Sequence, residues 1–215
     1  MKKLFALFSL FPALLFASPP PSTLLEMAGA HPAPAALSKS VVLVIDAQRE
    51  YVDGALPLVG IDSALAEGSR LLKRARTAGT PVIHVVHRGA APLFDPDGPY
   101  FAIAEPLAPV AGETVIEKRM PNAFAGTDLQ QKLAATGRKQ IIVIGFMTHM
   151  CISSTVRAAL DLGYATTLVS AATATRDLPD GKGGTLPAQA VQQATLAALA
   201  DRFATVVTKA DELPR

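Results

Sequence analysis

The sequence contains one cysteine, Cys151, in 215 residues. A single cysteine cannot form an internal disulfide, so it is either a buried, inert side chain or a free thiol with a chemical role. The sequence also lacks a block of charges of one sign, because its acidic and basic residues are mixed and give a net charge of only +2. Nucleic-acid-binding proteins carry a basic face or a charge run, so this composition argues against a nucleic-acid partner.

The N-terminal apolar run is too short to span a membrane comfortably. It covers Leu4–Phe16, apart from Ser9, and follows the two lysines of Met1-Lys2-Lys3. This pattern predicts a secretory signal peptide over residues 1–18, and no cysteine follows the run to carry a lipid anchor. Leu15 stands where a small residue is preferred before a cleavage site, so an uncleaved anchor stays open. We expect an exported protein, periplasmic or secreted, with no membrane contact after cleavage.

Proline is concentrated directly after this run. Residues 19–39 contain Pro19-Pro20-Pro21, Pro32 and Pro34, and we predict that they form a linker. The whole chain is 50% hydrophobic and 18% charged, which is ordinary for a globular protein. Residues 40–215 are therefore expected to form one domain with a substantial core.

Short apolar runs alternate with stretches of helical spacing along this domain. Ser40–Asp46 is a continuous apolar run that ends in a carboxylate, the pattern of a buried parallel strand. The other expected elements are strands at Pro81–His87, Thr114–Lys118, Ile141–Ile144, Ala165–Val169 and Phe203–Thr208, and helices at Ile61–Ala78, Asp128–Thr136, from Cys151 onward and at Gln189–Ala200. This alternation predicts a three-layer, Rossmann-like α/β fold, with an open six-stranded parallel sheet of order 3-2-1-4-5-6 and helices on both faces. Residues 88–112 are expected to be an active-site or interface loop.

Three chemically active side chains follow strands of this sheet. Asp46 follows the first strand, Lys118 ends the third, and Cys151 comes after the turn that follows the fourth. Ligands bind outside the carboxyl ends of the strands in such sheets, at the switch point between the first and fourth strands, so these groups are expected to meet there. A thiol attacks as its thiolate, so the carboxylate can serve as its base and the lysine as electrostatic support. The dipole of a helix that starts at Cys151 would also lower the thiol pKa.

Three motifs make the domain resemble the isochorismatase-like cysteine hydrolase superfamily. They are V-x-L-V-I-D-A-Q at Val41–Gln48, E-K-R-x-P-N-A-F-x-G-T-D-L at Glu117–Leu129, and G-F-M-T-H-M-C at Gly145–Cys151 with the following I-S-S-T-V-R-A-A-L-D-L-G-Y. The resemblance covers Ser40–Thr208 with the motifs in order. The superfamily has a six-stranded α/β fold and includes nicotinamidases, carbamoylsarcosine-type amidohydrolases, streptothricin hydrolase and true isochorismatases.

The resemblance implies a role for each member of a triad. Asp46 would be the general base, Lys118 the cation and Cys151 the nucleophile. It also implies a cis peptide bond between Phe146 and Met147, and an oxyanion hole formed by the backbone N–H groups of Met147 and Cys151. The implied reaction is metal-independent cleavage of a C–N bond in a small amide through a thioester intermediate.

Departures from the patterns of the superfamily narrow this chemistry. Siderophore-type isochorismatases commonly lack the cysteine, since vinyl-ether hydrolysis needs no thiol, so Cys151 favours C–N cleavage. Nicotinamidases carry a metal site with an Asp-x-His pair, and this sequence has no such pair. His84 and His87 are three residues apart on a strand, so they face opposite sides of the sheet and cannot chelate one ion together. We therefore expect no metal and no cofactor, with His84 pointing into the packing.

Five further residues are candidates for the substrate pocket because they lie in or beside loops at the same edge of the sheet. They are Gln48, Tyr51, His87, Phe124 and His149. Two alternatives to amide hydrolysis stay open, namely vinyl-ether hydrolysis of the isochorismatase type and non-catalytic binding of a small molecule. The expected partner is a small-molecule substrate, and the resemblance implies a homodimer or a larger homo-oligomer.

Overall fold

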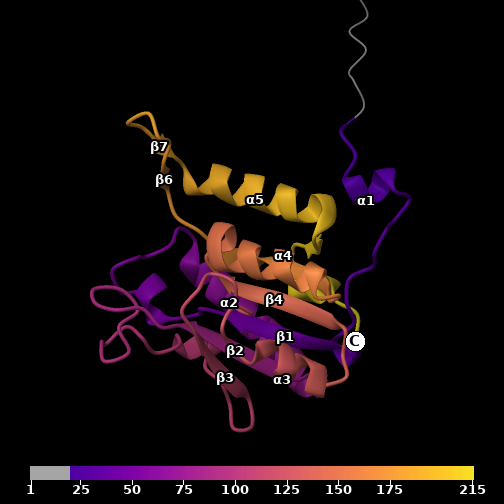
Figure 1. Ribbon diagram of the computed structural model, residues 1–215, viewed down its shortest axis with the longest axis horizontal. Helices are drawn as coiled ribbons and strands as arrows, with labels where there is room; N and C mark the ends of the chain where they lie inside the picture. The colour runs from indigo at the N-terminus through magenta and orange to yellow at the C-terminus, as the bar shows by residue number, and fades with distance from the viewer. Residues whose placement is uncertain (1–19) are drawn as a thin grey trace, which may run out of the picture.

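The sheet has the predicted topology. The computed structural model describes residues 20–215, so the predicted signal peptide lies outside the described residues. Six parallel strands lie in the order β3-β2-β1-β4-β5-β8 (Figure 1). The strands are β1 Ser40–Ile45, β2 Val82–His87, β3 Thr114–Lys118, β4 Gln140–Phe146, β5 Ala165–Ala174 and β8 Thr205–Val207. The predicted order 3-2-1-4-5-6 is confirmed, with β8 as the sixth strand of the sheet.

Helices cover both faces of this sheet and make it a three-layer structure. These helices are α2 Ile61–Thr77, α3 Leu129–Ala135, α4 Ser153–Asp161 and α5 Ala188–Arg202, and a short helix, α1 Leu24–Met27, lies beside α5 away from the sheet. In Figure 1, α3 and α4 lie on the near face with α5 beyond α4, and α2 lies behind the sheet. The right-handed crossovers of a parallel sheet place helices in this way.

The two faces of β1 separate the core into two halves. Val42 and Val44 belong to a cluster that includes Leu72 of α2, whereas Val41 and Leu43 belong to the cluster under α3 and α4. All six residues of β1 are buried. A parallel strand that is covered on both faces needs apolar side chains in succession, and this accounts for the continuous apolar run in its sequence. Each such buried aliphatic side chain contributes about 1.5–3 kcal/mol by its removal from water.

Strand β5 is longer than the sequence pattern predicts. It continues from Val169 to Ala174, and its pairing with β4 shifts register between Val143 and Gly145. A register shift of this kind lets a strand bend and re-aim the residues at its end. The consequence is that Thr175 and the residues after it emerge at the edge of the sheet where the triad was expected.

The segment before β1 is more ordered than the predicted linker. Ala35 and Leu37 are buried, and the Ala35 N–H donates to Thr167 Oγ1 at 2.9 Å. Leu24 N–H donates to Asp201 Oδ1 at 2.8 Å, which ties α1 to the end of α5. Proline composition predicted a linker here, and a few apolar residues and backbone donors hold the described part of it against the domain.

A short hairpin of β6 Leu178–Pro179 and β7 Thr185–Leu186 projects from the domain before α5 (Figure 1). The sequence pattern predicted only a loop there, because two-residue strands carry no readable periodicity. None of the helices in residues 20–215 combines the length and the apolar character needed to cross a membrane.

Candidate active site

Asp46, Lys118 and Cys151 meet at the carboxyl edge of the sheet, where the sequence placed them. Lys118 Nζ lies 2.7 Å from Asp46 Oδ2 and 3.3 Å from Cys151 Sγ. The exposed fractions are 0% for Asp46, 1% for Lys118 and 4% for Cys151. An ion pair and a thiol therefore share one site that is almost closed to water.

Local backbone geometry brings Asp46 into this position. Its φ of 49° lies in the left-handed region, where Asp is tolerated better than bulkier residues, and its N–H donates to Val85 O at 2.7 Å. A non-glycine residue held in this region costs on the order of 1–2 kcal/mol, and such residues concentrate at functional sites. The turn directs the Asp46 carboxylate along the sheet edge toward β3.

Gly145 allows β4 to lie against β1 beside the site. Its φ is 118°, and a Cβ at this position would lie 1.9 Å from Ile45 O. Only glycine fits this close approach of two backbones. The chain then passes from Phe146 to Met147 through a cis peptide bond.

Cys151 lies in a π-helical turn, not at the first residue of a helix. The turn spans Thr148–Ile152 and runs directly into α4. π-helical turns are rare in proteins overall, and many of those that occur are found at functional sites. The N–H of Met147 makes no backbone hydrogen bond within residues 20–215, so it is a free donor at the start of the turn that contains Cys151.

The electrostatics of the thiol differ from the sequence prediction. Burial and the nearby negative charge of Asp46 raise the pKa of Cys151 to about 12, against the opposing effect of Lys118. Burial also raises the pKa of Asp46, while the Lys118 charge lowers it. The direction is opposite to the lowered thiol pKa expected from a helix dipole, so the resting side chain is a neutral thiol next to a carboxylate that can take its proton.

His87 and Gln48 lie beside the triad but have different surroundings. His87 Nδ1 is 3.1 Å from Lys118 Nζ, and burial together with the Lys118 charge lowers the pKa of His87 to about 4. Gln48 is fully buried, and its amide bonds the backbone of His87 and the Phe101 carbonyl at 2.8–3.0 Å. Its hydrogen-bonding groups thus hold the loop in place and are not free to bind a ligand.

The other three predicted pocket residues do not share one environment. The Tyr51 ring packs edge-on against Phe146 at 6.0 Å, and burial, followed by the charge of Asp46, raises the Tyr51 pKa well above its usual value. Tyr51 therefore lies close to the reacting groups. Phe124 stacks on Tyr164 at 6.1 Å and, only partly buried, packs against the core under α3 and α4.

His149 and Arg176 lie together on another side of the site. His149 Nδ1 is 2.5 Å from Thr175 Oγ1, and burial and then the charge of Arg176 lower the His149 pKa. The Arg176 charge also acts on Tyr51. Arg176 Nε is buried without a hydrogen-bond partner, and within residues 20–215 the side chain forms no salt bridge.

Sequence reasoning missed Arg176 because it ended the fifth strand at Val169. With β5 extended to Ala174, Arg176 becomes a charged residue just past a strand end, which is the signal that identified Asp46 and Lys118. Phe94 was missed as well. It is buried on the loop after β2 and packs edge-on against Tyr51 at 5.1 Å and His87 at 5.2 Å.

Within residues 20–215, no three His, Cys, Asp or Glu side chains are grouped so that they could hold a metal ion. His84 and His87 point to different partners, as strand alternation predicts. His84 Nε2 lies 2.9 Å from Glu113 Oε2, whereas His87 faces Lys118.

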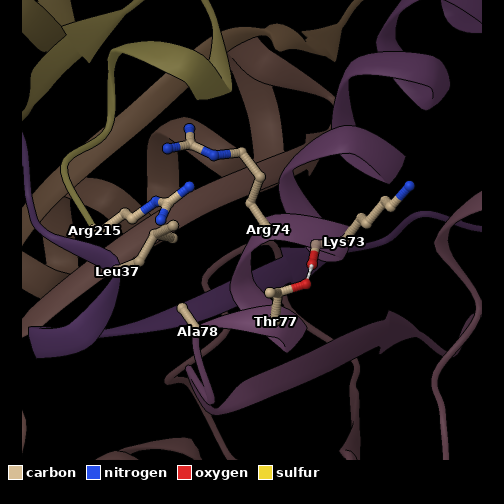
Figure 2. Close-up of a pocket in the computed structure, with 6 residues that line it drawn as sticks. All are labelled: Leu37, Lys73, Arg74, Thr77, Ala78 and Arg215. Atoms are coloured by element: carbon tan, nitrogen blue, oxygen red, sulfur yellow. Dashed lines mark hydrogen bonds between the residues drawn. The ribbon is translucent and has the colours of Figure 1, made fainter.

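A cavity of about 300 Å³ lies at the opposite end of the strands, beside the C-terminal end of α2 (Figure 2). Its lining residues are Leu37, Lys73, Arg74, Thr77, Ala78 and Arg215. Arg74 donates to Leu213 O at 2.9 Å and also to Ala210 O, so it ties the C-terminal segment to α2. This cavity contains no member of the triad.

The chain has clear relatives among known proteins. The isochorismatase domain model matches residues 40–211. A secreted isochorismatase effector of Verticillium dahliae is 38% identical over 88% of this chain and 98% of its own length. A maleamate amidohydrolase of Pseudomonas putida is 31% identical over 61% of this chain and 70% of its own length. The crystal structure of an isochorismatase from Pseudomonas putida is 46% identical and superposes with a TM-score of 0.85 over 90% of this chain and 99% of that one.

Proposed function

Because the chain belongs to the isochorismatase family, we propose that it is a cysteine hydrolase that cleaves a C–N bond of a small amide. One observation carries this proposal: the Lys118 ammonium lies 2.7 Å from a carboxylate and 3.3 Å from the only thiol of the chain, in a nearly closed site. A hydrolase that acts on a vinyl ether has no use for a thiol, whereas amide cleavage through an acyl-enzyme requires a nucleophile. The relative named as an amidohydrolase supports the same chemistry.

Each step of the reaction has a residue to perform it. Asp46 takes the Cys151 proton as Sγ attacks the amide carbon, so the thiolate forms only when it is needed despite the raised thiol pKa. The oxyanion is stabilised by the N–H groups of Met147 and Cys151. Asp46 then gives its proton to the leaving amine as the C–N bond breaks, and a thioester remains on Cys151.

Water completes the cycle. Asp46 accepts a proton from the water as it attacks the thioester carbon, the C–S bond breaks, and the proton returns to Sγ. The products are a carboxylic acid and an amine, and the enzyme regains its thiol. The Lys118 ammonium offsets negative charge on the carboxylate and on the sulfur throughout.

The surroundings of Arg176 support a further proposal, that the substrate carries a carboxylate. The Arg176 guanidinium is partly buried, and within residues 20–215 it has no acidic partner, although its Nη1 donates to Asp177 O at 3.0 Å. Its Nε is buried without a hydrogen-bond partner, so the guanidinium suits a planar anion, which it can bind through two parallel hydrogen bonds. Maleamate, which gives one relative its name, has a carboxylate beside its amide. We therefore propose small amides of dicarboxylic acids, or similar amides with one anionic group, as the substrate class.

A matched pair of substrates tests both parts of the proposal. Initial rates of acid or amine release are measured for an amide that carries a carboxylate and for its neutral analogue. We expect Cys151→Ala to abolish hydrolysis of both, and Arg176→Met to lower kcat/KM for the anionic amide while leaving the neutral amide unchanged. Full activity of Cys151→Ala would refute the cysteine mechanism, and equal effects of Arg176→Met on both amides would refute the anionic substrate class.

The same variants separate the two alternative functions. A vinyl-ether hydrolase would keep its activity on a vinyl ether in Cys151→Ala. A non-catalytic binding protein would bind the anionic amide with unchanged affinity in Cys151→Ala and would hydrolyse it in neither form.

We also propose that the protein is exported and acts as a homo-oligomer. The charged and apolar pattern of residues 1–18 supports export, and one relative is named as a secreted effector. Mass spectrometry of the soluble exported protein should find an N-terminus after residue 18, and retention of Met1–Lys3 would contradict cleavage.

A further inference from the structure

Lys118 reaches its partners across the end of the strand that lies between them. Lys118 ends β3, Asp46 follows β1, and β2 lies between these two strands. His87 ends β2 and is the register partner of Lys118. The lysine side chain must therefore pass His87 to arrive at Asp46.

The Lys118 ammonium has three N–H donors and three acceptors around it. Asp46 Oδ2 is at 2.7 Å, His87 Nδ1 at 3.1 Å and Cys151 Sγ at 3.3 Å. Two of these acceptors react in the proposed mechanism, and the third does not. A lysine side chain is long and flexible. Its contacts with Asp46 and Cys151 change during turnover, so a third contact that does not change holds the ammonium more firmly in place.

We propose that His87 is a positioning residue whose Nδ1 holds the Lys118 ammonium between the base Asp46 and the nucleophile Cys151. This inference rests on the proposed function, since it assigns His87 a role in the same reaction. It also replaces the expectation that His87 lines the pocket as a substrate contact.

His87 is itself held rigidly enough for this role. Its backbone N–H donates to Gln48 Oε1 at 2.8 Å, and its carbonyl accepts from Gln48 Nε2 at 3.0 Å. Its ring packs edge-on against Phe94 at 5.2 Å. Since an ammonium can only donate, Nδ1 must accept and the ring proton must be on Nε2. The lowered pKa of His87, about 4, keeps the ring neutral near pH 7, as an acceptor must be.

Two variants distinguish the effect of the His87 acceptor atom, Nδ1, from the effect of the packed ring. His87→Phe keeps the ring against Phe94 and removes the acceptor. His87→Asn removes the ring and keeps an acceptor, because Oδ1 of Asn can take the place of Nδ1. We expect His87→Phe to lower kcat roughly 10- to 100-fold with KM little changed, as small misplacements of catalytic groups do, and His87→Asn to stay near the wild-type kcat.

A second measurement does not depend on turnover. In ¹⁵N-labelled protein, a hydrogen-bonded, buried lysine ammonium gives a distinct NMR signal, which Lys118→Met identifies by its loss. We expect this signal to disappear or shift in His87→Phe and to persist in His87→Asn.

The proposal is overturned if His87→Phe keeps both the wild-type kcat and the Lys118 signal, or if His87→Asn is as impaired as His87→Phe. Failure of the proposed function looks different. In that case Cys151→Ala would retain turnover, while the Lys118 signal would still report whether His87 holds the ammonium.

Discussion

Cys151 and Asp46 control each other's proton affinity. The thiol has a pKa of about 12 because it is buried and because the Asp46 charge is close. A nucleophile kept neutral until the substrate arrives is protected from unwanted alkylation and oxidation, since these reactions need the thiolate. The carboxylate raises the thiol pKa at rest and still takes the proton during attack.

Asp46→Asn should therefore separate activity from thiol acidity. We expect hydrolysis to fall at least about 100-fold because the general base is gone. The pKa of Cys151 should fall below about 12 at the same time, because one of the causes that raise it is removed. Asn tolerates the φ of 49° as Asp does, so the backbone is preserved.

The thiolate absorbance measures this pKa directly, since the chain has one cysteine and Cys151→Ala provides the blank. An unchanged or higher pKa in Asp46→Asn would mean that the carboxylate does not act on the thiol.

At the scale of elements, the contact between β1 and β4 sets the site. Gly145→Ala places a Cβ 1.9 Å from Ile45 O, a clash that only a backbone shift can relieve. We expect the free energy of unfolding to fall by more than about 4 kcal/mol, or the variant not to fold. Urea unfolding measures the change.

Gly163→Ala is the matched control for this variant. Gly163 has a φ of 79°, but its Cβ would meet nothing within 4 Å. The cost should therefore be only the backbone term of about 1–2 kcal/mol. Equal losses in the two variants would show that positive φ alone, and not the approach of β1, determines the effect at Gly145.

Element order could be predicted from the sequence because parallel strands buried on both faces read as apolar runs, as β1 does. The carboxyl ends of these runs then placed Asp46 and Lys118 at one edge without further information. The end of β5 could not be predicted, because small residues after Val169 lack a strand pattern and the register shift opposite Gly145 has no sequence signal. Because the end of β5 was placed too early, Arg176 was not identified as a residue at the edge of the sheet.

The thiol pKa could not be predicted for a different physical reason. A helix start next to Cys151 was visible in the sequence and favoured the thiolate. The depth of burial and the distance to Asp46 depend on tertiary packing, and they dominate.

At the scale of the whole molecule, one carboxylate joins three elements. Glu113, just before β3, pairs with Arg76 of α2 at 2.9 Å and with His84 of β2 at 2.9 Å, and accepts from Val110 N–H at 3.0 Å. Burial alone would raise the pKa of Glu113, but these hydrogen bonds lower it to about 2. Because the folded pKa lies below the unfolded value, the ion pair stabilises the fold above about pH 4.5, and this contribution is lost as pH falls toward 2.

Glu113→Gln should therefore flatten the acid side of the stability profile. We expect the loss of unfolding free energy between about pH 5 and pH 2 to be smaller than in the wild type by about 1–2 kcal/mol, after allowance for solvent screening. Urea unfolding at several pH values measures it. Glu117→Gln, which removes an exposed ion pair with Arg88, should change the profile little. Parallel wild-type and Glu113→Gln profiles would show that Glu113 does not carry this dependence.

The central claim is that Cys151 attacks the amide and carries the acyl group. Intact-mass spectrometry of enzyme quenched during turnover of a carboxylate-bearing amide tests it most directly. The predicted result is a mass increase equal to the acyl group, located at Cys151, and neither adduct nor turnover in Cys151→Ala. Hydrolysis at the wild-type rate by Cys151→Ala, with no adduct on the wild-type protein, would contradict the account.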